Sequence, residues 1–313
     1  MAKIKECMGI DVVIATYNRS SVIENLINKL LKQCQPDDSI YVVFQNIREK
    51  KDFDSPTVKS LFSSPPNLPK ARNAGINAGV NPIILFLDDD VIPDENLMNN
   101  HRFCYQQTWI GAVAGYVDDP LFDRNILSPS TFDPSCGKLV QNFSVSKSQY
   151  TISVMGANMS FRRESLMEIG GFDTCFKRNA LWEDIDCAFR LLKINKKIWF
   201  CSQARVTHMR NKAGGCREDK SSKYIYNSYA NTAYFCCKYI PGKFLKTWCT
   251  YWKYRLEYET RTKAKAKAKL LSHNIFWIIA ALSGVVTGIL RFCISGKRKG
   301  LPIQIYSECG KNS

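Results

Sequence analysis

The apolar run at residues 83–87 leads directly into Asp88, Asp89 and Asp90, and this junction constrains the fold more than any other stretch of the chain. A continuous apolar run of this length is typical of a strand buried on both faces, as in a parallel sheet. The carboxylates then lie at the carboxyl end of the strand, the edge where open α/β sheets bind ligands. Three adjacent negative charges repel one another unless a divalent cation or hydrogen-bond donors neutralise them. The alternative is a solvated acidic turn before a helix that begins near Pro93 and Asp94.

The opening of the chain predicts two parallel strands joined by a helix. Residues 10–15 and 40–44 are apolar and strand-like, and residues 22–31 carry apolar side chains at helical spacing. A strand–helix–strand unit of this kind implies a right-handed crossover. Residues 16–19 and 45–46 follow the two strands. We therefore expect both loops at the same edge of the sheet as the three aspartates.

The middle of the chain adds a second acidic group. Small residues from 71 to 78 predict a helix packed close to the sheet, with Lys70 and Arg72 near its start. Glu183 and Asp184 open a later helix, where acids favour the helix dipole whether or not they have another role. The loop at 118–138 is a candidate for the acceptor side. Further strands are expected at 111–117, 140–145, 151–154 and 198–201.

The net charge of +16 implies a polyanionic partner such as nucleic acid, anionic lipid or a phosphorylated substrate. Residues 275–290 are apolar or small, a run shorter than the ~20 residues that span a bilayer. An interfacial or buried helix fits this run, and a tilted or extended span is the alternative. Basic residues beside it favour a membrane surface over nucleic acid. These are Lys263, Lys265, Lys267, Lys269, Arg291, Lys297, Arg298 and Lys299.

The 13 cysteines do not form a metal or disulfide pattern, because none lies in a Cys-x-x-Cys pair or a Cys/His cluster with zinc spacing. Several lie among apolar residues, as buried thiols do in a reducing compartment. Residues 1–8 are polar and contain no secretory apolar segment. We therefore expect a cytoplasmic protein attached peripherally to the inner face of the membrane, with a single span as the alternative.

Seven short motifs follow one another in an order typical of a known family. They are Thr-Tyr-Asn-Arg after the first strand, a polar pair after the second, Lys-Ala-Arg-Asn-x-Gly, Asp-Asp-Asp, Gly-Ala-Asn-x-Ser-Phe-Arg-Arg, Gly-Gly-Phe-Asp and Trp-Glu-Asp-x-Asp-x-x-x-Arg. Over roughly residues 10–217 the chain resembles the family 2 glycosyltransferases, which have the GT-A fold. The resemblance implies an α/β, Rossmann-like and mostly parallel central sheet with helices on both faces. We expect this domain at 8–217 and a helical, basic and apolar, membrane-associating extension at 218–313.

The resemblance also implies a role for individual residues. The donor-nucleotide pocket of the family maps onto Thr16, Tyr17, Asn18, Arg19, Gln45, Asn46, Lys70, Arg72, Asp88 and Asp89. Asp88 and Asp90 match the Asp-x-Asp motif, with Asp88 toward the ribose and Asp90 on the metal. Glu183 and Asp184 match the pair that supplies the catalytic base, for which Asp184 is the first choice. Asn158 and Trp182 are expected on the sugar and acceptor side.

Two further assignments concern the region after residue 205. His208 is either structural or a ligand that completes the metal site, as a histidine at a similar place does in some members of the family. Arg210 and Arg217 lie in a Gly-rich loop that is a candidate lid over the diphosphate.

The resemblance implies a reaction as well. A divalent cation (Mn²⁺ or Mg²⁺) and a nucleotide-sugar donor are expected, with inverting transfer of a hexosyl or deoxyhexosyl group to an acceptor hydroxyl. The family usually carries an aspartate after the second strand, where this chain has Gln45 and Asn46. An amide oxygen also accepts from the imide N–H of a uracil or thymine base, so UDP- or dTDP-sugars are expected. The expected acceptor is a saccharide or a lipid-linked one, in synthesis of a cell-surface polysaccharide or glycolipid.

Two other classes of protein use a similar sheet. A non-catalytic module that binds nucleotide sugars would lack the metal or base carboxylates, which are present here. A nucleotidyltransferase would carry a Gly-rich, basic phosphate loop after its first strand. Residues 16–19 do not form such a loop.

Overall fold

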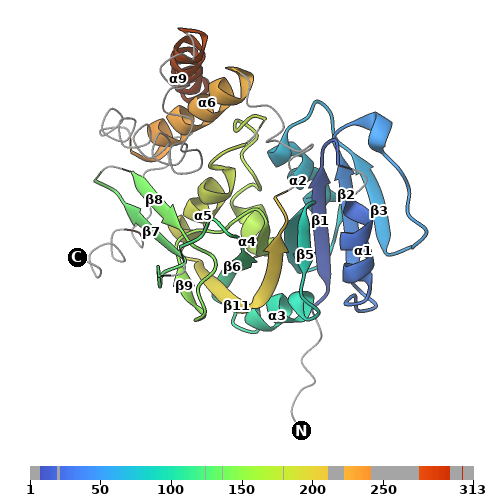
Figure 1. The fold of residues 1–313 in the computed structure, drawn as a ribbon. Coiled ribbons are helices and arrows are strands. Elements are labelled where there is room, and N and C mark those ends of the chain that lie inside the picture. Colours follow the sequence, from blue (N-terminus) through green and yellow to red (C-terminus); the bar gives the residue numbers. More distant parts are fainter. Residues whose placement is uncertain are drawn as a thin grey trace.

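A single large sheet with helices packed against it organises the chain in the computed structural model (Figure 1). The structure describes residues 8–19, 22–123, 125–135, 137–178, 180–210, 222–240, 275–296 and 305. The strands are β1 (Ile10–Thr16), β2 (Ser39–Phe44), β3 (Val58–Phe62), β4 (Ile83–Asp88), β5 (Val91–Pro93), β6 (Ile110–Asp118), β7 (Ser130–Asp133), β8 (Lys138–Gln141), β9 (Gln149–Thr151), β10 (Asn158–Arg162) and β11 (Lys197–His208). The helices are α1 (Ile23–Leu31), η1 (Ile47–Glu49), α2 (Leu68–Ala78), α3 (Leu97–Cys104), α4 (Arg163–Glu168), α5 (Glu183–Lys193), α6 (Ser222–Tyr239) and α9 (Ile275–Ser295).

The nine-stranded sheet has the order β3-β2-β1-β4-β10-β6-β11-β5, and β9 also pairs with β11. Strands β1 to β4 pair in parallel, as do β6 and β11, while β10 runs antiparallel between β4 and β6. The expected mostly parallel α/β sheet is confirmed. Its consequence is that β1, β4, β6 and β11 all end at one edge, where Thr16, Asp88, Asp118 and His208 lie.

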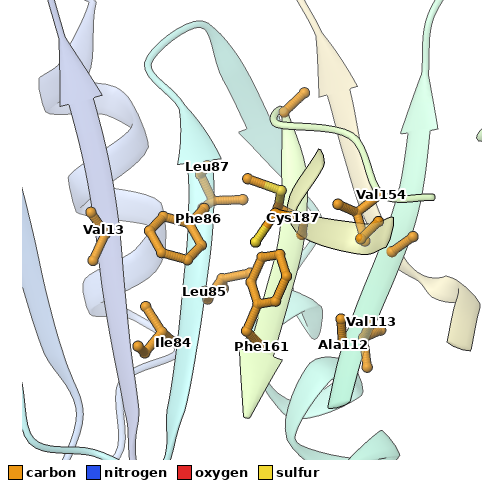
Figure 2. Close-up of a cluster of buried hydrophobic side chains, with 14 of the residues drawn as sticks. Val13, Ile84, Leu85, Phe86, Leu87, Ala112, Val113, Val154, Phe161 and Cys187 are labelled. Atoms are coloured by element: carbon orange, nitrogen blue, oxygen red, sulfur yellow. The ribbon is translucent and has the colours of Figure 1, made fainter. Parts of the chain in front are cut away.

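Strand β4 lies at the centre of the hydrophobic core. Ile83, Ile84, Leu85 and Phe86 are fully buried, and Figure 2 shows β4 between β1 and β10 with its side chains on both faces. Phe86 packs edge-on against Phe161 of β10, with ring centroids 5.8 Å apart. Burial of each such side chain contributes about 1.5–3 kcal/mol. The apolar run that predicted a strand buried on both faces therefore forms one.

Several strands differ from the prediction. The expected strand at 198–201 continues to His208 as β11, across a bulge between Cys201 and Arg205. Polar residues in this bulge interrupt the apolar run, which is why the sequence pattern ended too early. The strand expected at 140–145 corresponds to β8, which lies earlier and ends at Gln141. The strand expected at 151–154 corresponds to β9, which also lies earlier and ends at Thr151. Strands β3, β5 and β7 were not predicted, because β3 and β7 are half-exposed segments with little apolar signal and β5 is only three residues long.

Helix α6 shares the core of the sheet domain. Lys238 is buried, and its Nζ donates to Asp173 Oδ2 at 2.8 Å and also bonds Asp186. The hydroxyl of Tyr239 donates to Asp186 Oδ1 at 2.7 Å. The predicted division at residue 217 therefore does not separate two independent cores.

Helix α9 packs on α6 through glycines. A Cβ on Gly288 would lie 2.3 Å from the carbonyl oxygen of Ala230, and one on Gly284 would lie 2.4 Å from that of Tyr226. Only glycine permits this approach of the two backbones. Within the part of the chain that the structure describes, no helix is both long enough and apolar enough to cross a membrane. Residues 241–274 of the expected helical extension lie outside the described residues.

The buried cation of α6 leads to a prediction about stability. Lys238→Met leaves Asp173 and Asp186 without their shared cation, so we expect unfolding free energy to fall by about 3–5 kcal/mol. Urea denaturation measures this change. The control is Lys50→Met, which removes a surface ion pair between Lys50 Nζ and Asp52 Oδ1 (3.6 Å) and should cost at most about 1 kcal/mol. Equal costs for the two variants would contradict the structural role of Lys238.

Candidate active site

Two acidic groups meet at the sheet edge, and the side chain of Arg72 connects them. Arg72 lies in the first turns of α2, which Asn67 caps by accepting from the backbone N–H of Lys70 at 3.0 Å. Its guanidinium is buried, pairs with Glu183 and lies 3.5 Å from Asp88 Oδ1. A third contact is a bond of 3.3 Å from Nη2 to the carbonyl oxygen of Gly156. Arg72 therefore joins the end of β4 to the start of α5.

Glu183 and Asp184 lie side by side but have different environments. Glu183 is buried against Arg72, and burial raises its pKa to about 8 although the guanidinium opposes the shift. Asp184 is only partly buried and accepts from the backbone N–H groups of Ile185, at 2.9 Å, and Gly156, at 3.1 Å. Burial also raises the pKa of Asp184, against the effect of Arg72 and these N–H donors. Asp184 thus keeps a carboxylate positioned by backbone groups, while Glu183 is committed to Arg72.

Asp89 is held by two residues that follow β1. Its carboxylate accepts from Thr16 Oγ1 at 2.8 Å and from Arg19 Nη1 at 3.0 Å. Arg19 Nη1 also lies 3.0 Å from Asp90 Oδ2. Burial raises the pKa of Asp89 to about 6, with Arg19 acting in the opposite direction. Asp89 and Asp90 are 6% and 4% exposed, so the alternative of a solvated acidic turn is wrong.

Asp88, Asp90 and His208 form a group that fits a divalent cation. One ligand atom from each lies within 4.8 Å of the others. His208 Nε2 is 3.3 Å from Asp90 Oδ1, and this buried nitrogen has no hydrogen-bond partner among the described residues. Carboxylate oxygens suit Mn²⁺ or Mg²⁺, and an imidazole nitrogen is a ligand for transition-metal ions such as Mn²⁺. Burial acts against charge on His208, but the neighbouring carboxylates of Asp119 and Asp90 raise its pKa to about 9.

Asp119 is a site residue that the sequence analysis missed. It is fully buried at the end of β6 and accepts from His208 Nδ1 at 3.1 Å. Arg210 Nε donates to both carboxylate oxygens of Asp119, at 2.8 and 2.7 Å. These donors hold the pKa of Asp119 well below its usual range in spite of burial. The same rule that singled out the aspartates after β4, applied to the end of β6, would have found it.

Arg210, one of the two candidate lid residues, is therefore tied to the residue that orients His208. Arg217, the other candidate, lies outside the described residues.

The other predicted nucleotide contacts surround the same edge. Gln45 Oε1 accepts from the backbone N–H of Asn67 at 2.8 Å, which fixes the start of α2. Asn46 caps η1 and donates to Asn18 Oδ1 at 2.9 Å. Tyr17 and Lys70 are half-buried beside them.

Asn158 and Trp182 lie near the site but are engaged in packing. Asn158 is fully buried, and its Nδ2 donates to the carbonyl oxygens of Tyr116, at 3.0 Å, and Ala204, at 2.9 Å. The Trp182 ring stacks on Phe235 of α6 at 4.6 Å, and its Nε1 donates to a threonine of the same helix. The assignment of both residues to the sugar and acceptor side stays a prediction.

Residues 8–225 match the family model described as Glycosyltransferase like family 2. The chain belongs to this family. The O-antigen chain rhamnosyltransferase RfbN of Salmonella typhimurium (strain LT2) is 23% identical over 215 residues, which cover 65% of this family 2 chain and 67% of RfbN.

Two solved structures share the fold of this family 2 chain. GalNAc-T7 with UDP, GalNAc and Mn²⁺ has a TM-score of 0.54 at 16% identity, over 75% of this chain. The chain spans about half (51%) of the length of GalNAc-T7. The mannosyltransferase PcManGT from Pyrobaculum calidifontis, with GDP-Man and Mn²⁺, has a TM-score of 0.51 at 15% identity, over 97% of this chain and 79% of PcManGT. These likenesses confirm the GT-A fold.

Asp119 leads to a prediction about metal binding. Asp119→Asn keeps the shape of the side chain but weakens its hold on His208 Nδ1, so we expect affinity for Mn²⁺ to fall about 10–100-fold. Electron paramagnetic resonance of free Mn²⁺ in titrations measures this affinity. Asp52→Asn, at an exposed position, is the matched loss of one charge and should leave the affinity unchanged. Unaltered affinity in a folded Asp119→Asn protein would contradict the role of Asp119.

Proposed function

We propose that this chain is an inverting, metal-dependent glycosyltransferase that moves a sugar from a nucleotide-diphosphate donor to an acceptor hydroxyl. The observation that carries the proposal is the pairing of two acidic groups at one sheet edge. Asp88, Asp90 and His208 form one group and Asp184 belongs to the other, with Arg72 between them. An inverting transfer requires a charge-stabilising site for the leaving group and a base on the opposite face of the sugar.

Asp184 is the proposed base. It takes the proton of the acceptor hydroxyl as the oxygen attacks the anomeric carbon. Its partial exposure lets a hydroxyl reach it, and the N–H groups of Gly156 and Ile185 hold its position. Glu183 is proposed to position Arg72 instead, because its carboxylate is buried in that ion pair.

Asp88, Asp90 and His208 are the proposed ligands of Mn²⁺ or Mg²⁺. The buried Nε2 of His208 supports this assignment, because it faces Asp90 without a hydrogen-bond partner among the described residues and such a nitrogen is costly unless a ligand completes it. When bound, the cation supplies positive charge that stabilises the leaving nucleoside diphosphate. Lys70, half-buried at the start of α2, is proposed to add a second positive charge beside the diphosphate. Arg72 is not proposed for this role, because protein groups enclose it.

The proposed donor is a UDP- or dTDP-sugar carrying a hexosyl or deoxyhexosyl group. Gln45 Oε1 accepts from Asn67 and Asn46 Oδ1 accepts from Arg48, so we propose that the second lone pair of one of these amide oxygens accepts the hydrogen bond from the base. The likeness to an O-antigen chain rhamnosyltransferase supports a saccharide or lipid-linked acceptor in cell-surface polysaccharide or glycolipid synthesis. Peripheral attachment to the cytoplasmic face of a membrane is part of the proposal, supported by the basic and apolar C-terminal third.

The central test measures turnover and donor binding separately. We expect purified protein with Mn²⁺ to release nucleoside diphosphate from one member of a nucleotide-sugar panel when acceptor is present. Asp184→Asn should lower transfer about 10²–10⁴-fold, the usual effect of losing a general base, while the donor still raises the melting temperature. Asp90→Asn should weaken Mn²⁺ binding as well as transfer. Donor binding by the wild type with no transfer to any acceptor would instead indicate a non-catalytic module.

The raised pKa of Asp184 leads to a prediction about pH. A base acts in its deprotonated form, so activity is lost as pH falls through the pKa of Asp184. Because that pKa is raised, the acidic limb of the kcat profile should lie above the usual aspartate value of about 4. A profile of kcat against pH measures it. If Glu183→Gln, rather than a change at Asp184, removed the limb, Glu183 would be the base.

A further inference from the structure

Helix α9 exposes a continuous apolar face. Its exposed large side chains are Ile279 (51%), Leu282 (59%), Val286 (57%), Leu290 (54%) and Ile294 (86%), which we call the outer face of α9. Their spacing of three to four residues places them on one side of the helix. Ser283 and Cys293 are the other exposed side chains beside them. Single exposed apolar residues are ordinary, but a row of five marks an interaction surface.

The opposite side of α9 already has its partner. Gly284 and Gly288 lie against the backbone of α6, Ala281 is buried there, and Arg291 Nη1 donates to Asn231 of α6 at 3.0 Å. Figure 1 shows α6 and α9 side by side at one end of the molecule, away from α1 and α3. Within the described part of the chain, the outer face is therefore the side of α9 that remains for a partner outside the fold.

The charge of the flanking sequence favours lipid as that partner. Residues 260–307 contain nine Lys and Arg and no Asp or Glu. An apolar helix face in a strongly basic sequence has the chemistry of an interfacial helix on an anionic lipid surface. A symmetric dimer through the same face would bring two basic sequences together, which like-charge repulsion opposes. The five aliphatic side chains also lack the Trp, Tyr and Arg that dominate protein interfaces.

The position of α9 links this face to the catalytic helix. α9 packs on α6, and Phe235 of α6 stacks on Trp182, the residue before Glu183. Lys238 of α6 bonds Asp186, one turn further along α5. The chain of buried contacts from α9 to α5 holds the proposed base at a fixed orientation relative to the outer face.

We propose that the outer face of α9 docks on an anionic lipid surface and presents the active site to an acceptor carried by that membrane. The part of this inference that concerns the acceptor rests on the proposed function. The docking itself does not depend on catalysis. The outer face of α9 is thus the surface that attaches the protein. A lipid-linked acceptor is the class of substrate that such attachment would serve.

The test uses the full chain and vesicles of stated composition. Leu282, Val286 and Leu290 are replaced together by Gln, which changes no charge. The matched control replaces Val80, Phe103 and Leu127, exposed apolar residues elsewhere on the surface, by Gln. We expect the wild type and the control to sediment with phosphatidylcholine vesicles that contain phosphatidylglycerol. The α9 variant should bind them at least about tenfold more weakly, because three apolar side chains no longer enter the lipid.

Each other outcome decides against the docking. Equal vesicle binding by wild type and α9 variant would overturn it, as would absence of binding by the wild type. A wild-type dimer that the α9 variant converts to a monomer, measured by light scattering without vesicles, would assign the face to a second copy. Melting curves check that the α9 variant is folded. Nucleoside diphosphate release from donor without vesicles tests the proposed function separately, so its failure leaves a positive vesicle result standing.

Discussion

The guanidinium of Arg72 is the contact on which the candidate site depends. It is enclosed by Glu183, Asp88 and Gly156, which come from α5, β4 and the segment before β10. A buried charge is stable only when several partners compensate it, and removal of one partner leaves the others uncompensated. Arginine suits this position because its planar fork can bond in several directions at once and stays charged when buried. The geometry of both acidic groups therefore follows from one side chain of α2.

A second buried cation, Lys238, also holds helix α5 in place. Glu183 pairs with Arg72, whereas Asp186 bonds Lys238 of α6 and also accepts from Arg190 Nε at 2.8 Å. The acids at the start of α5 therefore have different partners. Glu183 and Asp186 pair with buried cations, whereas Asp184 pairs with none and is partly exposed. The helix-dipole effect explains why acids occur in this turn. The two buried cations explain why Asp184, and not Glu183 or Asp186, can act on a substrate.

The parts predictable from sequence were those set by local pattern and by strand direction. The apolar run of β4 and the parallel order placed residues 16–19, Asp88 and Asp90 at one edge, and the family resemblance added His208 as a candidate. Tertiary partners decided the rest. Trp182 preceded the acids without an evident reason, since its partner Phe235 lies far along the chain. Asp119 follows an apolar strand as Asp88 does, but its partner His208 is not evident from sequence, because the two meet only when β6 and β11 lie side by side.

The Gly-Ala-Asn segment acts on the site through its backbone. All polar atoms of the Asn158 side chain are used, because Nδ2 donates to β6 and β11 and Oδ1 lies 2.8 Å from His101 Nε2. Burial lowers the pKa of His101 to about 4, so the ring is neutral. Its Nε2–H donates the hydrogen bond that Asn158 Oδ1 accepts. This satisfied network fixes the register in which Asn158 pairs with Leu87 of β4, and a slip of one residue would turn every side chain of β10 to the other face. Gly156, two residues earlier, is thereby held where its N–H meets Asp184 and its carbonyl oxygen meets Arg72. Asn158 can thus serve the reaction without touching the sugar.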